Sequence, residues 1–266
     1  MNTVTLTLKK VPELYLECEQ VTPDTFAGKT LDQIAGITGY HGKEMPTMGE
    51  YFTITGESGA TAAETKIVVN GDCTKIKYLG AKMTAGEMVI NSACDMYTGA
   101  WMKGGKLTVN GDVHSFCGLA MAGGEFIING NAGNYLGAAY RGDWRGMSGG
   151  VLRVKGNAGS DVATFMTGGE MIIGGDVDIH LGTHMEGGKI ILKGDANRRI
   201  GGQLVKGEIY VFGTINVMLP GYKPVGEVEL EVDGTKAKFV DYIGDLGERH
   251  PKRKGETVYG HLYMKK

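Results

Sequence analysis

The sequence predicts an all-β chain folded as a single-stranded parallel β-helix of about seven to eight coils, with a cap at each end. Three observations predict this fold: a repeat of 19 residues, glycines at fixed phases of the repeat, and a methionine that recurs at one further phase. A repeat this short, with one strand in it, cannot bury a core alone. Neighbouring coils are therefore expected to stack.

Each repeat begins with glycine and continues into a short apolar strand, as in Gly105-Lys-Leu-Thr-Val-Asn. The leading glycines are Gly86, Gly105, Gly124, Gly150, Gly169, Gly188 and Gly207. Successive starts are 19 residues apart, except for a step of 26 between Gly124 and Gly150 that holds a 7-residue insertion. A degenerate coil precedes them at residues 67–72. The segment Gly49-Glu-Tyr-Phe-Thr-Ile is a candidate for one more coil.

Alternation along each strand assigns the directions of its side chains. In the coil from Gly105, Leu107 and Val109 point inward and Thr108 points outward. A second glycine follows six positions after the first, and the residue after it is Asp or Asn, which predicts a turn with positive φ at that glycine. These polar residues are Asp72, Asp112, Asn131, Asn157, Asp176 and Asp195. A small inward residue comes next, such as Cys94 or Ala132.

A methionine column supports stacking. Three positions before the leading glycines stand Met83, Met102, Met121, Met147, Met166 and Met185, followed by Leu204 in the last coil. Identical residues at one phase of a repeat stack when the coils stack, and a flexible thioether fills an irregular interior well. Helical repeats are excluded, because so many glycines in 19 residues would destabilise two packed helices.

The repeat divides the chain into three parts. Residues 1–62 form an N-terminal capping segment, residues 63–216 the β-helix, and residues 217–266 a C-terminal cap and tail. Caps are expected because a terminal coil would expose unpaired backbone and apolar surface. A strand is predicted over residues 3–8 and a short helix near residues 31–34. The basic cluster at 249–254 is either a solvated loop or a docking site for an acidic partner.

Composition limits the functional classes. The net charge is −2, which gives no general attraction to nucleic acid or to an anionic membrane. No 18-residue apolar run and no signal-peptide core is present, so a cytoplasmic chain without a membrane segment is predicted. Cys18, Cys73, Cys94 and Cys117 lack the spacing of a zinc site, and reduced thiols are expected.

No set of residues in the sequence has the spacing of a catalytic or metal site. His180 and His184 are four residues apart, but Gly182 lies between them in an extended turn, which disfavours a metal pair. The Asp and Asn column could be a cation ladder or a polysaccharide-cleaving face, yet the mixture of Asp with Asn is typical of turns. The prediction is that this chain contains no catalytic residue, no metal ligand and no cofactor.

Two features indicate contact with a partner. The insertion contains Tyr140, Arg141, Asp143, Trp144 and Arg145, and Tyr, Trp and Arg are enriched in interface hot spots. A neutral bulge is the alternative. The outward strand positions are mostly apolar, which predicts a face that something covers. They are Val68, Val89, Thr108, Ile127, Arg153, Ile172, Ile191 and Tyr210.

The coil motif resembles the GXGXG β-helix domain, which forms the C-terminal part of the large subunit of glutamate synthase. Chain length and the segments at 21–26 and 49–54 are similar to those of the family of C subunits of formylmethanofuran dehydrogenase. The resemblance implies a right-handed β-helix that acts as a non-catalytic scaffold. It carries over no catalytic residue to this chain.

The same resemblance implies a complex that reduces CO2 and fixes it as a formyl group on methanofuran in methanogenesis. The implied partners are a formate-dehydrogenase-like subunit with a tungsten or molybdenum pterin, an amidohydrolase-like subunit with zinc, and iron–sulfur subunits. Two alternatives stay open. One is the C subunit of a bacterial formyltransferase/hydrolase complex, and the other is a carbohydrate-active β-helix enzyme.

Overall fold

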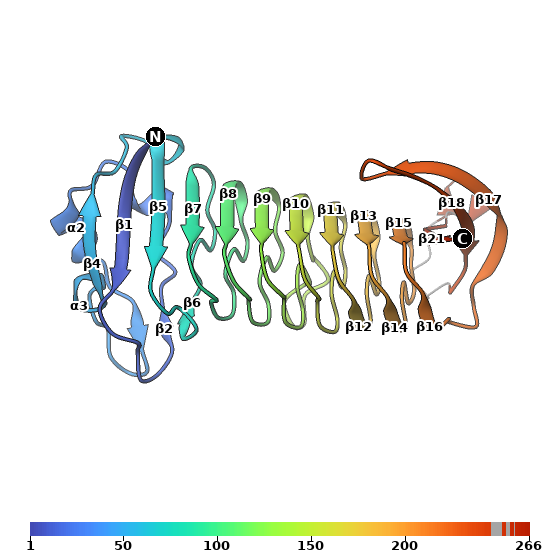
Figure 1. Ribbon diagram of the computed structural model, residues 1–266, viewed down its shortest axis with the longest axis horizontal. Coiled ribbons are helices and arrows are strands. Elements are labelled where there is room, and N and C mark those ends of the chain that lie inside the picture. Colours follow the sequence, from blue (N-terminus) through green and yellow to red (C-terminus); the bar gives the residue numbers. More distant parts are fainter. Residues whose placement is uncertain (246–251, 254–255, 258) are drawn as a thin grey trace.

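The structure is a computed structural model that describes residues 1–245, 252–253, 256–257 and 259–266, with side chains for the first and last of these ranges. The molecule is elongated, and its strands stand side by side along the long axis (Figure 1). The all-β prediction is confirmed, because the described helices are short. They are α1 (Pro23–Phe26), α2 (Leu31–Ala35), α3 (Met48–Tyr51) and the 3-10 turn η1 (Ala62–Glu64).

A 13-stranded sheet runs the length of the molecule. Eight of its parallel strands come one from each coil: β5 (Thr65–Asn70), β7 (Glu87–Ile90), β8 (Lys103–Val109), β9 (Gly123–Ile128), β10 (Ser148–Val154), β11 (Gly168–Ile173), β13 (Glu186–Leu192) and β15 (Lys206–Val211). Leu107 pairs with Phe126, and Phe126 pairs across the insertion with Leu152. The repeat is therefore the step from one strand to its parallel neighbour, and the insertion leaves the register intact.

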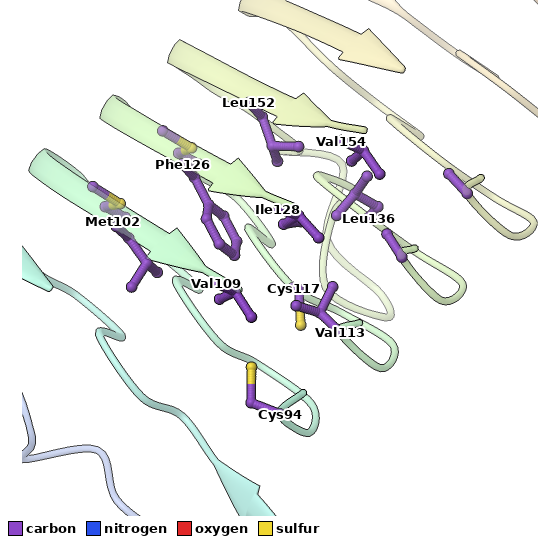
Figure 2. Packing of buried hydrophobic residues seen from close by; sticks show 14 of the residues in the cluster. Cys94, Met102, Val109, Val113, Cys117, Phe126, Ile128, Leu136, Leu152 and Val154 are labelled. Carbon is purple, nitrogen blue, oxygen red and sulfur yellow. The ribbon is translucent and has the colours of Figure 1, made fainter. Parts of the chain in front are cut away.

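The chain returns through a second parallel ladder in every coil. Bridges join the small inward residues in succession, from Cys73 to Cys94, Val113, Ala132, Ala158 and Val177. From there the ladder widens into a three-stranded sheet of β12 (Val177–Ile179), β14 (Ala196–Arg198) and β16 (Ile215–Val217). Figure 2 shows Met102, Phe126 and Leu152 projecting from the main sheet into the interior, with Val113 and Cys94 on the opposite wall.

The methionines and leading glycines fit together from coil to coil. The six methionines are fully buried. A Cβ atom placed on Gly105 would lie 2.5 Å from Cε of Met83, and one on Gly124 would lie 2.8 Å from Cε of Met102. The same relation joins Gly150 to Met121, Gly169 to Met147, Gly188 to Met166 and Gly207 to Met185. Each methionine thus fills the space that the leading glycine of the next coil leaves.

The conformations of the two glycine columns differ from the sequence prediction. The leading glycines have positive φ, for example 84° at Gly124. The second glycines of the coils after Gly71 do not, so the prediction of a positive-φ turn there is wrong for them. Their glycine is required for another reason: a Cβ on Gly130 would collide with Oδ1 of Asp112 in the preceding coil. Gly156, Gly175, Gly194 and Gly213 have the same relation to the preceding Asx residue.

In a third segment of each coil, every second residue has a left-handed backbone conformation, and the residues between them are right-handed or extended. Tyr97, Gly99 and Trp101 have φ of 62°, 67° and 55°. Their N–H groups donate to Ser115 and Leu119 of the next coil and to Leu79 of the preceding coil. Left-handed φ costs a non-glycine residue about 1–2 kcal/mol. The hydrogen bonds to both neighbouring coils offset that cost and continue the stack around this corner.

The N-terminal end extends the sheet. Strand β1 (Asn2–Leu8) pairs in parallel with β5 and antiparallel with β4 (Phe52–Gly56), which confirms the strand predicted over residues 3–8. The segment at 49–54 is not a coil, because it begins in helix α3 and its strand runs antiparallel to β1. A small sheet of β3 (Tyr40–His41), β2 (Leu16–Glu17) and β6 (Ile76–Lys77) completes this end.

At the C-terminal end, β17 (Lys223–Val232) and β18 (Thr235–Ile243) form a hairpin, and β21 (His261–Lys265) joins it to β15. The hairpin folds back over the outer face of the main sheet (Figure 1). Its Val232 and Phe239 pack on Ile172, Ile191 and Tyr210. The last third of the apolar outward stripe is therefore covered by the chain itself.

Two short strands, β19 (Lys252–Arg253) and β20 (Glu256–Thr257), pair within the C-terminal tail. The basic cluster at 249–254 lies outside the residues whose side chains the structure describes. In the described part of the chain, no helix has the length and apolarity to cross a membrane.

Candidate partner-binding surface

The insertion forms a projecting loop between β9 and β10. The carboxylate of Asp143 accepts hydrogen bonds from the backbone N–H of Trp144 at 2.8 Å and from Nε of Arg145 at 3.1 Å. The Arg145 guanidinium is the main reason that the pKa of Asp143 is lowered. Trp144 is 60% exposed and Tyr140 is 49% exposed. The loop therefore holds two large aromatic side chains out from the molecule.

Four aromatic rings stack beside this loop. Tyr78, Tyr97, Phe116 and Tyr135 stand one coil apart, with successive ring centroids at 4.7, 5.2 and 4.7 Å. The planes of neighbouring rings differ by 5°, 9° and 3°. We call these four rings the aromatic ladder. The sequence prediction did not include them, although their recurrence at one phase of the repeat was the available signal.

Residues of the insertion lie along the aromatic ladder. The guanidinium carbon of Arg141 is 5.8 Å from the ring centroid of Phe116 and 5.9 Å from that of Tyr135. The Tyr140 ring lies 6.4 Å from Trp101, which in turn stacks on Tyr97 at 6.2 Å. The insertion is therefore not an isolated bulge, because it adds a cation and an exposed ring to an existing aromatic surface.

The hydroxyls of Tyr78 and Tyr97 stay protonated at neutral pH. Burial, together with the neighbouring Tyr97, Glu17 and Glu19, raises the pKa of Tyr78 to about 12. Burial also raises the pKa of Tyr97. The hydroxyls can consequently donate as well as accept hydrogen bonds, whereas neither is suited to act as a base.

Beyond the insertion the same column becomes polar. His180 Nδ1 lies 3.1 Å from Oδ1 of Asp161, and Arg199 Nη1 lies 3.2 Å from His180 Nε2. His184 belongs to a different column and stacks on Phe165 at 4.7 Å. The two histidines thus have separate partners. No group of three or more His, Cys, Asp or Glu side chains able to hold a metal ion occurs among the residues the structure describes.

The Asp and Asn column bonds one coil to the next. Oδ1 of Asp112 accepts the backbone N–H of Asn131 at 2.7 Å, and Oδ1 of Asp176 accepts that of Asp195 at 2.8 Å. Asn131, Asn157 and Asp195 act in the same way toward Asn157, Asp176 and Thr214. Both Asp and Asn supply the required oxygen. The mixture of the two residues is therefore explained by structure rather than by a cation ladder.

We expect Asp176→Ala to destabilise the fold by about 1 kcal/mol, because the N–H of Asp195 loses its acceptor. Asp176→Asn keeps that oxygen and is expected to change the free energy of unfolding by less than about 0.5 kcal/mol. Chemical denaturation of both variants checks this. A large loss with Asn would mean that the negative charge itself is required, as in a cation ladder.

In the first coils, charged residues two positions before the apolar outward stripe pair within the chain. Lys66 pairs with Glu87 at 2.9 Å, and Lys106 pairs with Glu125 at 3.0 Å. On the other flank of the strands, Asn91, Asn110 and Asn129 each donate to the preceding Asn of the column at 2.7–2.8 Å. These ion pairs and hydrogen bonds join each coil to the next on this face.

The four cysteines are free and buried in the core. Burial raises the pKa of each thiol, which keeps it protonated and unreactive. Cys73 and Cys94 occupy successive positions of the second ladder, as Figure 2 shows for Cys94 beside Val113. They therefore act as small apolar residues.

Proteins with similar sequences include C subunits of formylmethanofuran dehydrogenases. The chain is 48% identical over 97 residues to the C subunit of tungsten-containing formylmethanofuran dehydrogenase 2 of Methanothermobacter thermautotrophicus, which is 36% of each chain. It is 40% identical over 97 residues to the C subunit of the molybdenum-containing enzyme 1 of Methanosarcina barkeri, which is 36% of this chain and 32% of that one. The resemblance to C subunits of formylmethanofuran dehydrogenase is confirmed. These matches span about a third of the length of the relatives, and no family model matches.

A solved structure extends the likeness to the full fold. A chain of the formyltransferase/hydrolase complex of Methylorubrum extorquens, determined with methylofuran, superimposes with a TM-score of 0.83. The superposition covers 98% of each chain at 20% sequence identity. The two chains therefore share one fold.

Proposed function

We propose that this chain is the non-catalytic C subunit of a formylmethanofuran dehydrogenase complex, and that it holds larger subunits together. The observation that carries the proposal is the sequence similarity to the C subunits of both tungsten- and molybdenum-containing enzymes. Similar C subunits occur in enzymes that contain tungsten and in enzymes that contain molybdenum. A role of this subunit away from the metal explains why the same type of subunit suits both.

We further propose that the coils form a right-handed parallel β-helix over residues 63–216, with caps at 1–62 and 217–266. The two parallel ladders, each stepping one coil at a time, support this arrangement. The shared fold with a chain of the bacterial complex supports it as well. Its rigid, repetitive faces suit a part that must keep other subunits at a fixed separation.

The proposed complex reduces CO2 and fixes it as formyl-methanofuran. A formate-dehydrogenase-like subunit would carry the tungsten or molybdenum pterin. An amidohydrolase-like subunit would carry the zinc, and iron–sulfur subunits would carry the iron–sulfur clusters. The loop with Tyr140, Arg141, Asp143, Trp144 and Arg145 is proposed as one contact with them. A cytoplasmic location is proposed as well, in keeping with four unpaired, buried thiols.

A second candidate is the C subunit of a formyltransferase/hydrolase complex, which the superposition over 98% of the chain favours. The higher sequence identity to the methanogen proteins places it second. A carbohydrate-active enzyme fits the geometry poorly. Sugars stack on open ring faces, whereas the faces within the aromatic ladder are occupied by neighbouring rings.

Native mass spectrometry of the complex purified through a tag on this chain tests the proposal. We expect an assembly that contains formate-dehydrogenase-like and amidohydrolase-like subunits. A formyltransferase in place of the dehydrogenase would favour the second candidate. A monomer at every protein concentration tested, in an extract with assayable dehydrogenase, would contradict both.

A further inference from the structure

The aromatic ladder, together with Trp101, Tyr140 and Arg141, forms one surface that we call the aromatic corner. It has a hydrophobic cluster of its own, separate from the core, built on Ala100, Phe116 and Leu119. It continues toward the N-terminal cap, where Lys77 lies 4.1 Å over the ring of Tyr15. Lys77 directly precedes Tyr78 of the ladder and lines a hollow of about 430 Å³ together with Leu14, Tyr15, Glu17, Tyr40 and Gly42.

Ring geometry limits what this corner can bind. Because the rings of the ladder stack face to face, they present their edges and hydroxyls to the outside. Sugars and nucleobases bind aromatic side chains mainly by stacking on ring faces. Tyrosine edges with hydroxyls combine apolar area and hydrogen bonding, which is the combination enriched in protein interfaces.

Arg141 gives the corner a preference for charge. Its guanidinium is held near Phe116 and Tyr135, and no carboxylate among the described residues 1–245 and 259–266 forms an ion pair with it. Arg145 in the same loop differs, because Asp143 neutralises it. The rings position the Arg141 guanidinium and leave its N–H groups available. Such a guanidinium can donate two parallel hydrogen bonds to one carboxylate.

The size of the corner indicates the kind of occupant. Four rings at the spacing of neighbouring strands extend about 15 Å along the rod. A stable interface buries roughly 1,200 Å² or more in total, so an occupant has to reach beyond the four rings.

We propose that the aromatic corner docks a partner protein of the complex that presents an aspartate or glutamate side chain to Arg141. This inference rests on the proposed function, since it supplies a docking place for one of the larger subunits. The ladder provides a rigid apolar platform, and Arg141 fixes the orientation of the partner on it.

Variants of the purified complex test the inference. Arg141→Glu should raise the dissociation constant of the partner about 30-fold or more, because it places two carboxylates together. Arg141→Lys should have a smaller effect, since it keeps the charge and loses the two-point geometry. The control is Arg198→Glu, an exposed arginine in β14, which should change the constant less than about twofold.

A photo-crosslinker at position 140 makes the test independent of affinity. We expect the cross-linked peptide to come from a larger subunit and to contain Asp or Glu, and exchange of that residue for Arg should restore binding to the Arg141→Glu variant. Three results would overturn the inference and leave the scaffold proposal intact. They are an unchanged affinity of the Arg141→Glu variant, a cross-link to a second copy of this chain, and a cross-linked peptide without a carboxylate. Absence of any partner on the wild-type chain would instead overturn the scaffold proposal.

Discussion

Gly124→Ala is expected to lower the free energy of unfolding by about 3–4 kcal/mol. Gly124 has φ of 84°, which costs an L-residue about 1–2 kcal/mol. Its new Cβ would also lie 2.7 Å from O of Gly105 and 2.8 Å from Cε of Met102. Overpacking of that kind adds about 1–3 kcal/mol, since backbone of the neighbouring coil must move.

Replacement of two other glycines separates the cost of the positive φ from the cost of the close contacts. Gly142 in the insertion has the same φ of 84°, but a Cβ there would meet nothing within 4 Å, so Gly142→Ala is expected to cost only about 1–2 kcal/mol. Gly226 in β17 has neither a positive φ nor a close neighbour, and its replacement should be nearly neutral. Equal losses for Gly124→Ala and Gly142→Ala in denaturant titrations would show that close stacking contributes nothing.

Phe239→Ala is expected to release the C-terminal hairpin from the sheet. Phe239 is fully buried and meets Tyr210 and Phe212 edge to face at 5.8 and 5.4 Å. Truncation of such a ring typically costs about 3–5 kcal/mol. Hydrogen exchange should show lost amide protection in β17 and β18, with little change in β8 and β9, which lie coils away from the hairpin.

Val225→Ala on the same hairpin is the control. Val225 is 53% exposed, so its truncation should change the amide protection of the hairpin little.

Asp233 at the hairpin turn makes the stability of the hairpin depend on pH. Burial would raise its pKa, but Lys193 and Arg153 hold the pKa below the ordinary value. The stabilisation is therefore present above the ordinary pKa of an aspartate, near 4, and is lost as pH falls through the lower folded pKa. In the hydrogen-exchange experiment, unchanged protection of β17 after Phe239→Ala would refute the attachment of the hairpin to the sheet through Phe239.

The repeat could be predicted from the sequence because each coil meets the same steric demands. Gly105 must accommodate Met83, and the following coils repeat that fit, so spacing alone gave the strand register. The positive φ was assigned to the wrong glycine column. A glycine required by backbone conformation and one required by a neighbouring Asx side chain look identical in a sequence.

Features that depend on contacts outside the repeat could not be predicted. The hairpin over Ile191 lies outside the 19-residue repeat. The alternation of Val228, Leu230 and Val232 before Asp233-Gly234 was a signal for two strands and a tight turn. The cover it provides was not predictable, because it depends on Phe239 reaching Tyr210 across the sheet. The aromatic ladder was visible as a column spaced like the methionines. The position of Arg141 against Phe116 was not, because it depends on the path of a single loop.

The most direct test of the scaffold account is a reconstitution assay of methanofuran-dependent CO2 reduction. Three samples would be compared: this chain alone, the other subunits without it, and all subunits together. We predict no turnover by the chain alone, low turnover without it, and recovery when the chain is added, with recovery following assembly. Turnover by the isolated chain, or full activity of the other subunits in its absence, would contradict the account.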